Sequence, residues 1–99
     1  MKSIVDRIPQ EVLSSYKKIK DKGHKVYLVG GCVRNLLLGK PIKDWDFATS
    51  ATPEQILKLF KDSFYNNIFG TVGVPVELKD KKSVLEITTF RTEGTYKSI

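Results

Sequence analysis

The sequence predicts a small α/β or α+β protein with a mixed β-sheet flanked by helices. Two observations lead to this prediction. In the first part of the chain, segments with helical spacing of apolar residues alternate with short β-rich segments, and two β-rich segments joined by a polar turn follow. The first pattern is typical of strand–helix units and the second of an antiparallel hairpin. With 99 residues, the chain makes one domain at most, because it can bury only a single core.

The first expected element is a helix from about Ile8 to Lys22. Apolar residues recur there at helical spacing, Pro9 suits the first turn, and Gly23 is placed to end the helix. Four cations crowd its last turns, where they suit the helix dipole: Lys17, Lys18, Lys20 and Lys22. We interpret these lysines as a solvated face in preference to an RNA contact.

A strand, a glycine pair and a second helix follow. The apolar residues 25–29 (KVYLV) predict a strand that runs directly into Gly30 and Gly31. Residues 32–38 (CVRNLLL) predict a short helix, which Gly39 closes. Its first residue, Cys32, is interpreted as a small buried core residue.

The next strand and helix are predicted from alternation and capping. Residues 44–49 (DWDFAT) alternate like a strand. Thr52 is then expected to be an N-cap, with Pro53 at the first helical position and Gln55 closing a capping box. Three later aromatic residues are interpreted as core residues in preference to base-stacking residues: Phe64, Tyr65 and Phe69.

The last two expected strands form a hairpin. Residues 72–78 alternate, and Pro75 within them indicates an edge position or a bulge. Gly73 stands where a β-former is more usual, and we expect it to loosen that strand. Residues 79–82 (KDKK) predict a polar turn, and residues 83–91 (SVLEITTFR) predict the returning strand.

Composition restricts the class of protein. The net charge of +6 favours a polyanionic partner such as RNA, although charge alone does not separate RNA-binding proteins from other basic proteins. No apolar run approaches the ~20 residues that span a bilayer, so no membrane partner is expected. The lone cysteine, Cys32, cannot form an internal disulfide and favours the reducing cytoplasm. Nothing in the sequence predicts a protein partner.

Two aspartates flank Trp45 and suggest a metal site. On a strand, the side chains of Asp44 and Asp46 would point to the same side, about 7 Å apart. Two such carboxylates repel each other unless a cation or a base lies between them, and Mg²⁺ prefers carboxylate and phosphate oxygens. The structural alternative is that Asp44 caps a turn while Asp46 pairs with a lysine.

Two further features could complete such a site. Gly30 and Gly31 at a helix start would let backbone N–H groups approach a phosphate, and Arg34 could bind its oxygens, although a glycine pair also occurs in simple tight turns. Glu86 lies in an otherwise apolar strand, where an unpartnered carboxylate is costly to bury. It would either join the aspartates or face solvent.

Taken together, these motifs resemble a known family. The stretch YLVGGCVRNLLLGKPIKDWDFATSATPEQILKLF, followed by FGTVGV and LEITTFRTEGTY, resembles the class II tRNA nucleotidyltransferases (CCA-adding enzymes) and the similar bacterial poly(A) polymerases. Their pattern is G-G-x-V-R-D, then L-L-G, then D-x-D-x-A-T. The resemblance covers most of the chain, from Tyr27 to Tyr96. Asn35 departs from it, because the family usually has Asp there, and Asn can keep a hydrogen bond but no charge.

The resemblance implies a nucleotidyltransferase (polymerase-β-like) fold, truncated, with residues 1–99 as a partial catalytic head domain. It implies metal-dependent transfer of CMP or AMP from CTP or ATP to the 3′ end of tRNA, as CCA addition or repair. Mg²⁺ would be the cofactor. The implied metal-binding and catalytic residues are Asp44 and Asp46, with Glu86 as third acidic residue. The implied nucleotide-binding residues, which would hold the triphosphate, are Gly30, Gly31 and Arg34.

Other functions stay open at this level. Family members continue with a nucleotide-selecting helix and a helical tRNA-binding body that this sequence lacks, so we expect a fragment of a longer enzyme. The parent could be a poly(A) polymerase of the same family. The isolated chain could also be a nucleotide- and metal-binding module without turnover, or a basic domain that binds RNA without catalysis.

Overall fold

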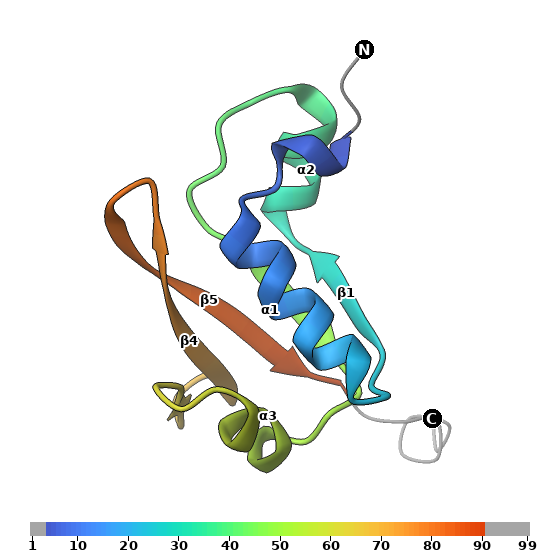
Figure 1. The fold of residues 1–99 in the computed structure, drawn as a ribbon, viewed down its shortest axis with the longest axis vertical. Coiled ribbons are helices and arrows are strands. Elements are labelled where there is room, and N and C mark those ends of the chain that lie inside the picture. Colours follow the sequence, from blue (N-terminus) through green and yellow to red (C-terminus); the bar gives the residue numbers. More distant parts are fainter. Residues whose placement is uncertain (1–3, 91–99) are drawn as a thin grey trace.

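A mixed five-stranded β-sheet forms the centre of the molecule (Figure 1). The computed structural model describes residues 4–90. The strands are β1 (Val26–Val29), β2 (Asp46–Thr49), β3 (Phe64–Asn66), β4 (Thr71–Leu78) and β5 (Lys81–Thr89). The helices are the 3₁₀-helix η1 (Ile4–Arg7) and the α-helices α1 (Gln10–Asp21), α2 (Gly31–Leu38) and α3 (Pro53–Leu59).

The strand order in the sheet is β1-β2-β5-β4-β3. Only β2 and β5 pair in parallel, with Asp46 opposite Glu86, and the other three pairs are antiparallel. The expected class, a mixed sheet with flanking helices, is therefore confirmed. The parallel pairing matters most for function, because it brings together two segments that lie far apart in the sequence.

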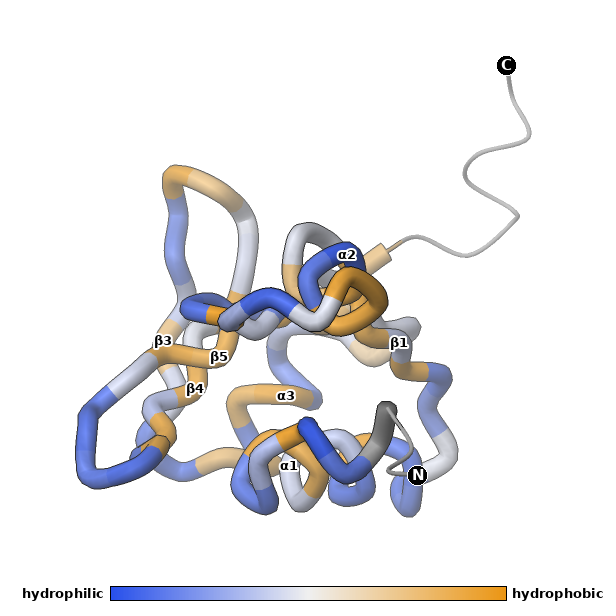
Figure 2. The backbone as a smooth tube through the Cα atoms, turned by 90° about the horizontal axis from the view of Figure 1, so that it is seen from above, coloured by the Kyte–Doolittle hydropathy of each residue, from blue (hydrophilic) through white to orange (hydrophobic). Residues whose placement is uncertain are grey.

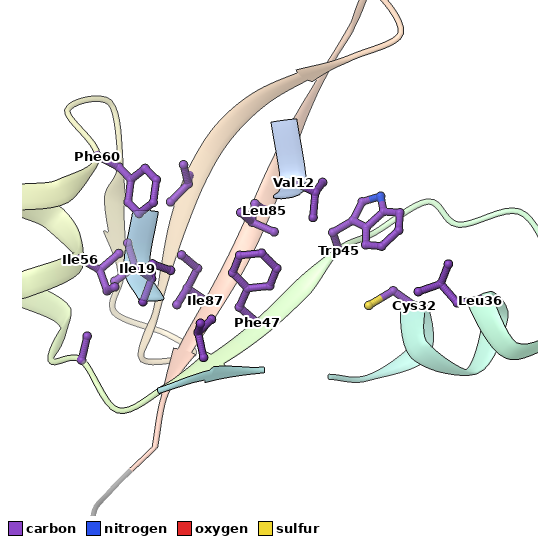
Figure 3. Packing of buried hydrophobic residues seen from close by; sticks show 14 residues of the cluster. Val12, Ile19, Cys32, Leu36, Trp45, Phe47, Ile56, Phe60, Leu85 and Ile87 are labelled. Atoms are coloured by element: carbon purple, nitrogen blue, oxygen red, sulfur yellow. The ribbon is translucent and has the colours of Figure 1, made fainter. Parts of the chain in front are cut away.

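The two faces of the sheet differ. Helices α1 and α3 cover one face, whereas α2 lies toward the other side (Figure 2). The covered face carries the core, in which Phe47, Leu85 and Ile87 are fully buried beside Ile19 of α1 and Ile56 of α3 (Figure 3). Because side chains alternate along a strand, residues next to these in sequence point to the uncovered face.

The helices begin and end close to the predicted positions. Pro9 is the N-cap of α1 and not part of its first turn, because its ψ of 148° is extended and the helix begins only at Gln10. The predicted capping box of Thr52 and Gln55 is present at α3. Gly39 ends α2 in the left-handed conformation, as expected. No helix within residues 4–90 has both the length and the apolar character needed to cross a membrane.

One strand is shorter than predicted. β2 begins at Asp46, so Asp44 lies in the irregular segment before the strand and not within it. The reason is that β1 turns away at Gly30, immediately after the pair of Val29 with Asp46. Asp44 therefore has no strand beside it on the β1 side.

The predicted hairpin is present as β4 and β5, and its turn is tighter than expected. Lys79 and Asp80 make the turn, with φ angles of 50° and 67°, and the next two lysines already belong to β5. Pro75 pairs in regular register, without a bulge, in the part of β4 that β3 does not reach. It therefore occupies a local edge. The predicted end of β5, Arg91, lies outside the described residues.

β3 was not predicted from the sequence, and its aromatic residues do not lie in the core as expected. Phe64 and Tyr65 lie on this edge strand and are 47% and 45% exposed, and Phe69 in the following loop is 70% exposed. The prediction that they fill the core was wrong. The segment forms β3, which extends the sheet along the edge of β4, so these rings do not pack between the sheet and its helices. Cys32, in contrast, is buried as expected, and its thiol donates to the Val29 carbonyl oxygen.

Candidate active site

One row of side chains crosses the uncovered face of the sheet. Register pairs each residue of the row with the next, from β1 through β2, β5 and β4 to β3. The members, in this order, are Val29, Asp46, Glu86, Gly73 and Phe64. Paired residues point to the same side of a sheet, with Cβ atoms about 4.5–5.5 Å apart in antiparallel pairs. Two acidic side chains thus stand next to each other at the centre of this face.

The three predicted carboxylates line one hollow. This hollow, which we call the acidic hollow, has a volume of about 330 Å³ and is lined by Asp44, Asp46, Val84 and Glu86. The structure therefore places Glu86 on the same side of the sheet as the aspartates. Of the two alternatives for Glu86, joining the aspartates or facing solvent alone, the structure has the first.

A second hollow, which we call the glycine hollow, adjoins the aspartates on their other side. Its volume is about 320 Å³, and its lining includes Gly31, Arg34, Lys43, Asp44 and Asp46. Both aspartates line both hollows. They therefore stand between the start of α2 and Glu86, so a ligand that contacts Arg34 on one side could reach the carboxylates from there.

The glycine pair lets the chain pass close to the carboxylates. Gly30 has φ 83° and ψ −157°, a conformation that is essentially restricted to glycine. A Cβ atom at Gly30 would lie 3.1 Å from Oδ2 of Asp46, and one at Gly31 would lie 3.5 Å from Nη2 of Arg34. The turn thus brings the backbone next to Asp46 and leaves Arg34 beside the start of the helix. This arrangement fits the predicted phosphate cradle.

Thr71 is a polar partner of Glu86 that the sequence analysis did not identify. Its hydroxyl donates to Oε2 of Glu86 at 3.0 Å, and the threonine is 93% shielded from solvent, with 7% of its surface exposed. Thr71 and Gly73 point to the same face of β4, and Gly73 is directly opposite Glu86. Thr71 therefore holds one oxygen of the glutamate while the carboxyl still lines the acidic hollow.

The carboxylates interact electrostatically. Burial raises the pKa of Asp46 above its ordinary value, and the nearby charges of Glu86 and then Asp44 raise it further. The ionised carboxylates therefore repel one another at neutral pH. A cation bound between them would relieve this repulsion and favour the ionised form of Asp46.

The donor set suits a hard divalent cation. All three groups supply carboxylate oxygens, the ligands that Mg²⁺ prefers, and they face an open hollow. However, within residues 4–90 no three acidic, histidine or cysteine side chains converge closely enough to surround one ion. The arrangement thus fits a cation that the protein binds through few side chains while other positions stay available to water or phosphate, as Mg²⁺ sites commonly do.

Hydrogen bonds hold the segment that carries Asp44. The Asn35 side chain donates from Nδ2 to the Pro41 carbonyl oxygen at 3.0 Å. The Arg7 guanidinium donates to the carbonyl oxygens of Leu36 at 2.9 Å and of Lys40 at 3.4 Å. The uncharged Asn35 amide thus makes a hydrogen bond as a donor. An ionised aspartate at position 35 could not donate the hydrogen bond to Pro41.

Solved structures share this fold. The chain is similar to the CCA-adding enzyme of Bacillus stearothermophilus in complex with CTP, with 38% identity, a TM-score of 0.67, and coverage of 95% of this chain and 22% of that one. It is also similar to the Thermotoga maritima CCA-adding enzyme complexed with tRNA, with 25% identity, a TM-score of 0.66, and coverage of 87% and 22%. The nucleotidyltransferase fold of these enzymes is therefore the fold of this chain.

Sequence comparison agrees with the structural one. A CCA-adding enzyme of Listeria innocua is 44% identical over 87 residues, which are 87% of this chain and 21% of that protein. The chain thus spans about a fifth of the length of the curated relatives it matches. The model of the poly A polymerase head domain matches residues 26–99, which include all six predicted site residues. The chain therefore belongs to the poly A polymerase head domain family, in which its relatives are CCA-adding enzymes.

Proposed function

We propose that residues 1–99 form part of the catalytic head of a tRNA nucleotidyltransferase that transfers CMP or AMP from CTP or ATP to the 3′ end of tRNA. In this proposal Asp44, Asp46 and Glu86 are the catalytic carboxylates, and the two aspartates hold Mg²⁺. Gly30, Gly31 and Arg34 bind the triphosphate. The enzyme would act in the cytoplasm, with which a single, free and buried cysteine is consistent.

One observation carries the proposal: the two aspartates line both the glycine hollow and the acidic hollow. Nucleotide transfer needs a phosphate-binding site and a hydroxyl-activating site within reach of the same metal ligands. The relatives support the choice of substrates, because solved CCA-adding enzymes of the same fold are complexes with CTP and with tRNA.

The protein's own groups have separate tasks. The Arg34 guanidinium and the N–H groups at the start of α2 would orient the triphosphate, because both favour anionic oxygens. The carboxylates would lie between the triphosphate and the RNA 3′-hydroxyl, with Glu86 on the side away from Arg34. When bound, Mg²⁺ would lower the pKa of the attacking hydroxyl and offset charge on the departing pyrophosphate. Thr71 would keep Glu86 in one orientation.

Incorporation of labelled nucleotide tests the proposal directly. The protein is incubated with tRNA that lacks its 3′ end, with labelled CTP or ATP, and with or without Mg²⁺. We expect Mg²⁺-dependent incorporation that Asp46→Asn reduces at least a hundredfold, by about 3 kcal/mol or more of lost transition-state stabilisation. The matched control is Asp62→Asn, which removes an exposed carboxyl outside both hollows and should leave incorporation unchanged.

The outcome also separates the remaining alternatives. Saturable, Mg²⁺-dependent nucleotide binding without incorporation would identify a binding module without turnover. This alternative is specific because the chain spans only about a fifth of the length of its relatives. Repeated AMP addition without CMP addition would identify a poly(A) polymerase. Equal incorporation by the parent and by Asp46→Asn would contradict the proposal itself.

A further inference from the structure

A third hollow lies at one end of the molecule and carries a strong positive charge. It has a volume of about 770 Å³, and its lining residues come from the segment after α2, the β4–β5 hairpin and the residues just before α1. Figure 1 shows where these segments lie. Its cationic lining residues are Arg7, Lys43, Lys79, Lys81 and Lys82. No aspartate or glutamate lines it. We call it the basic hollow.

The positive charge is available to a ligand. The Arg7 guanidinium already donates hydrogen bonds to two backbone carbonyl oxygens. The other four cationic residues of the lining are lysines, and all four are exposed to solvent. Two acidic residues are near in the hairpin: Asp80 in its turn and Glu77 opposite Lys82 in the strand pairing. Neither lines the hollow. Asp44 follows Lys43 in the sequence and lines the glycine and acidic hollows instead, so the four lysines exceed these three carboxylates by one charge.

The interior of the basic hollow is mostly apolar. Five apolar side chains line it together with the cations: Pro9, Pro41, Ile42, Trp45 and Leu78. Trp45 is 4% exposed, so its ring forms part of the floor and does not project. An apolar floor with a cationic rim suits a ligand that has both an uncharged part and phosphates, such as a nucleic acid strand. It suits a small, fully hydrated anion less well.

The basic hollow is connected to the catalytic residues. Lys43 lines both the basic hollow and the glycine hollow, and Asp44 follows it in the sequence. A strand bound along the lysines would therefore pass beside the segment that carries the aspartates. The lysines in the second half of α1 have no such connection, because they line neither the basic hollow nor the glycine hollow.

We propose that the basic hollow binds the sugar–phosphate backbone of an RNA strand whose 3′ end lies at the carboxylates. The identity of the strand as RNA rests on the proposed function, whereas the contact itself rests on the charge and shape of the hollow. Lys43, Lys79, Lys81 and Lys82 contact phosphates without reading the bases. Binding is therefore independent of sequence and depends steeply on salt.

The salt dependence of RNA affinity tests this inference. Fluorescence anisotropy of a short labelled single-stranded RNA is measured over a range of KCl concentrations. The parent is compared with a triple variant of the hairpin, Lys79→Gln, Lys81→Gln and Lys82→Gln. Each phosphate contact to single-stranded RNA contributes about 0.7 to the slope of log affinity against log salt, so this variant should reduce the slope by about 2. At 0.1 M salt its affinity should fall by at least tenfold.

A variant with the same loss of charge is the control. Lys17→Gln, Lys20→Gln and Lys22→Gln removes three exposed lysines from the second half of α1 and its C-cap, none of which lines the basic, glycine or acidic hollow. This variant should keep the parent's slope to within about 0.5, a fraction of one contact. Thermal melts of both variants show whether the fold is intact. Lys43→Gln in a separate sample tests the hollow without altering the hairpin and should reduce the slope by about 0.7.

Three results would overturn the inference. One is an equal loss of slope in the hairpin and α1 variants, which would mean that only net charge matters. Another is RNA affinity too weak to measure even at the lowest salt. The third is a hairpin variant that weakens CTP or ATP binding as strongly as RNA binding, since this would identify a mononucleotide site. If the inference fails while Asp46→Asn still abolishes incorporation, the proposed function stands without this contact.

Discussion

Gly73 has a specific role in the sheet, and its replacement gives a quantitative test of the row on the uncovered face. The sequence alone suggested that this glycine loosens β4. In the structure, a Cβ atom at position 73 would lie 2.4 Å from Cζ of Phe64 and 2.8 Å from Cε2. Glycine is therefore present because the Phe64 ring lies across it. We expect Gly73→Ala to displace that ring.

The size of the effect follows from how easily the ring can move. Overpacking a well-packed site costs about 1–3 kcal/mol. Because Phe64 is 47% exposed, its ring can swing toward solvent, and we expect a cost at the low end, about 1 kcal/mol. If Phe64→Ala is introduced first, the methyl group has room, and replacing a strand glycine by alanine should stabilise by about 0.5–1 kcal/mol.

A double-mutant cycle measures this coupling. Urea unfolding of the parent, the two single variants and the double variant gives the four free energies of unfolding. We expect Gly73→Ala to destabilise the parent and to stabilise the Phe64→Ala background, a coupling of about 1.5–2 kcal/mol. An equal effect of Gly73→Ala in both backgrounds would refute the packing of Phe64 on Gly73 and with it the position of β3.

Three further predictions concern Asp46 and two threonines. Because burial and neighbouring carboxylates raise the pKa of folded Asp46, its ionisation costs stability above that pKa, and the cost disappears below the unfolded pKa of about 3.9. Without metal, Asp46→Asn should therefore melt at or above the parent's temperature at pH 7, with a difference that shrinks toward pH 4; a less stable variant at pH 7 would contradict the electrostatics. Thr49→Val should lower the free energy of unfolding by about 1–3 kcal/mol, because the buried hydroxyl donates to the Lys25 carbonyl at 2.6 Å and accepts from the Ala51 N–H at 3.2 Å; unchanged urea unfolding would argue against both bonds. Thr52→Ala removes the capping box of α3 and should cost about 1 kcal/mol, with Thr52→Ser as the conservative control that restores most of it.

Local signals in the sequence were enough to predict most of the elements. The capping box at Thr52, the glycine at the end of α2 and the alternation of β4 each act over a few residues, so their outcome hardly depends on the rest of the fold. Boundaries were less accurate where a neighbour decides them. Asp44 lies outside β2 because β1 turns away at Gly30, and no pattern within residues 44–49 can indicate that turn.

The residues of the candidate site could be predicted from their types, but the contacts between them could not. An acidic residue in an apolar strand identified Glu86 as a candidate, yet its place beside Asp46 depends on the parallel pairing of β2 with β5. The pairing of β4 with β5 likewise brings Thr71 to Glu86, so the hydrogen bond between them had no local signal. The exposed aromatic residues of β3 were misjudged because hydrophobicity does not tell whether a three-residue edge strand lies beside a core or outside it.

The most direct test of the account is where a divalent cation binds. Mn²⁺ prefers the same carboxylate and phosphate oxygens as Mg²⁺ and broadens the NMR signals of nearby nuclei. Titrated into the isotopically labelled protein, it should broaden first the amide signals of Gly30, Asp46 and Glu86. This pattern should disappear in Asp46→Asn and persist in Asp62→Asn. Broadening that begins elsewhere on the chain, or that Asp46→Asn leaves unchanged, would contradict the assignment of the carboxylates as a metal site.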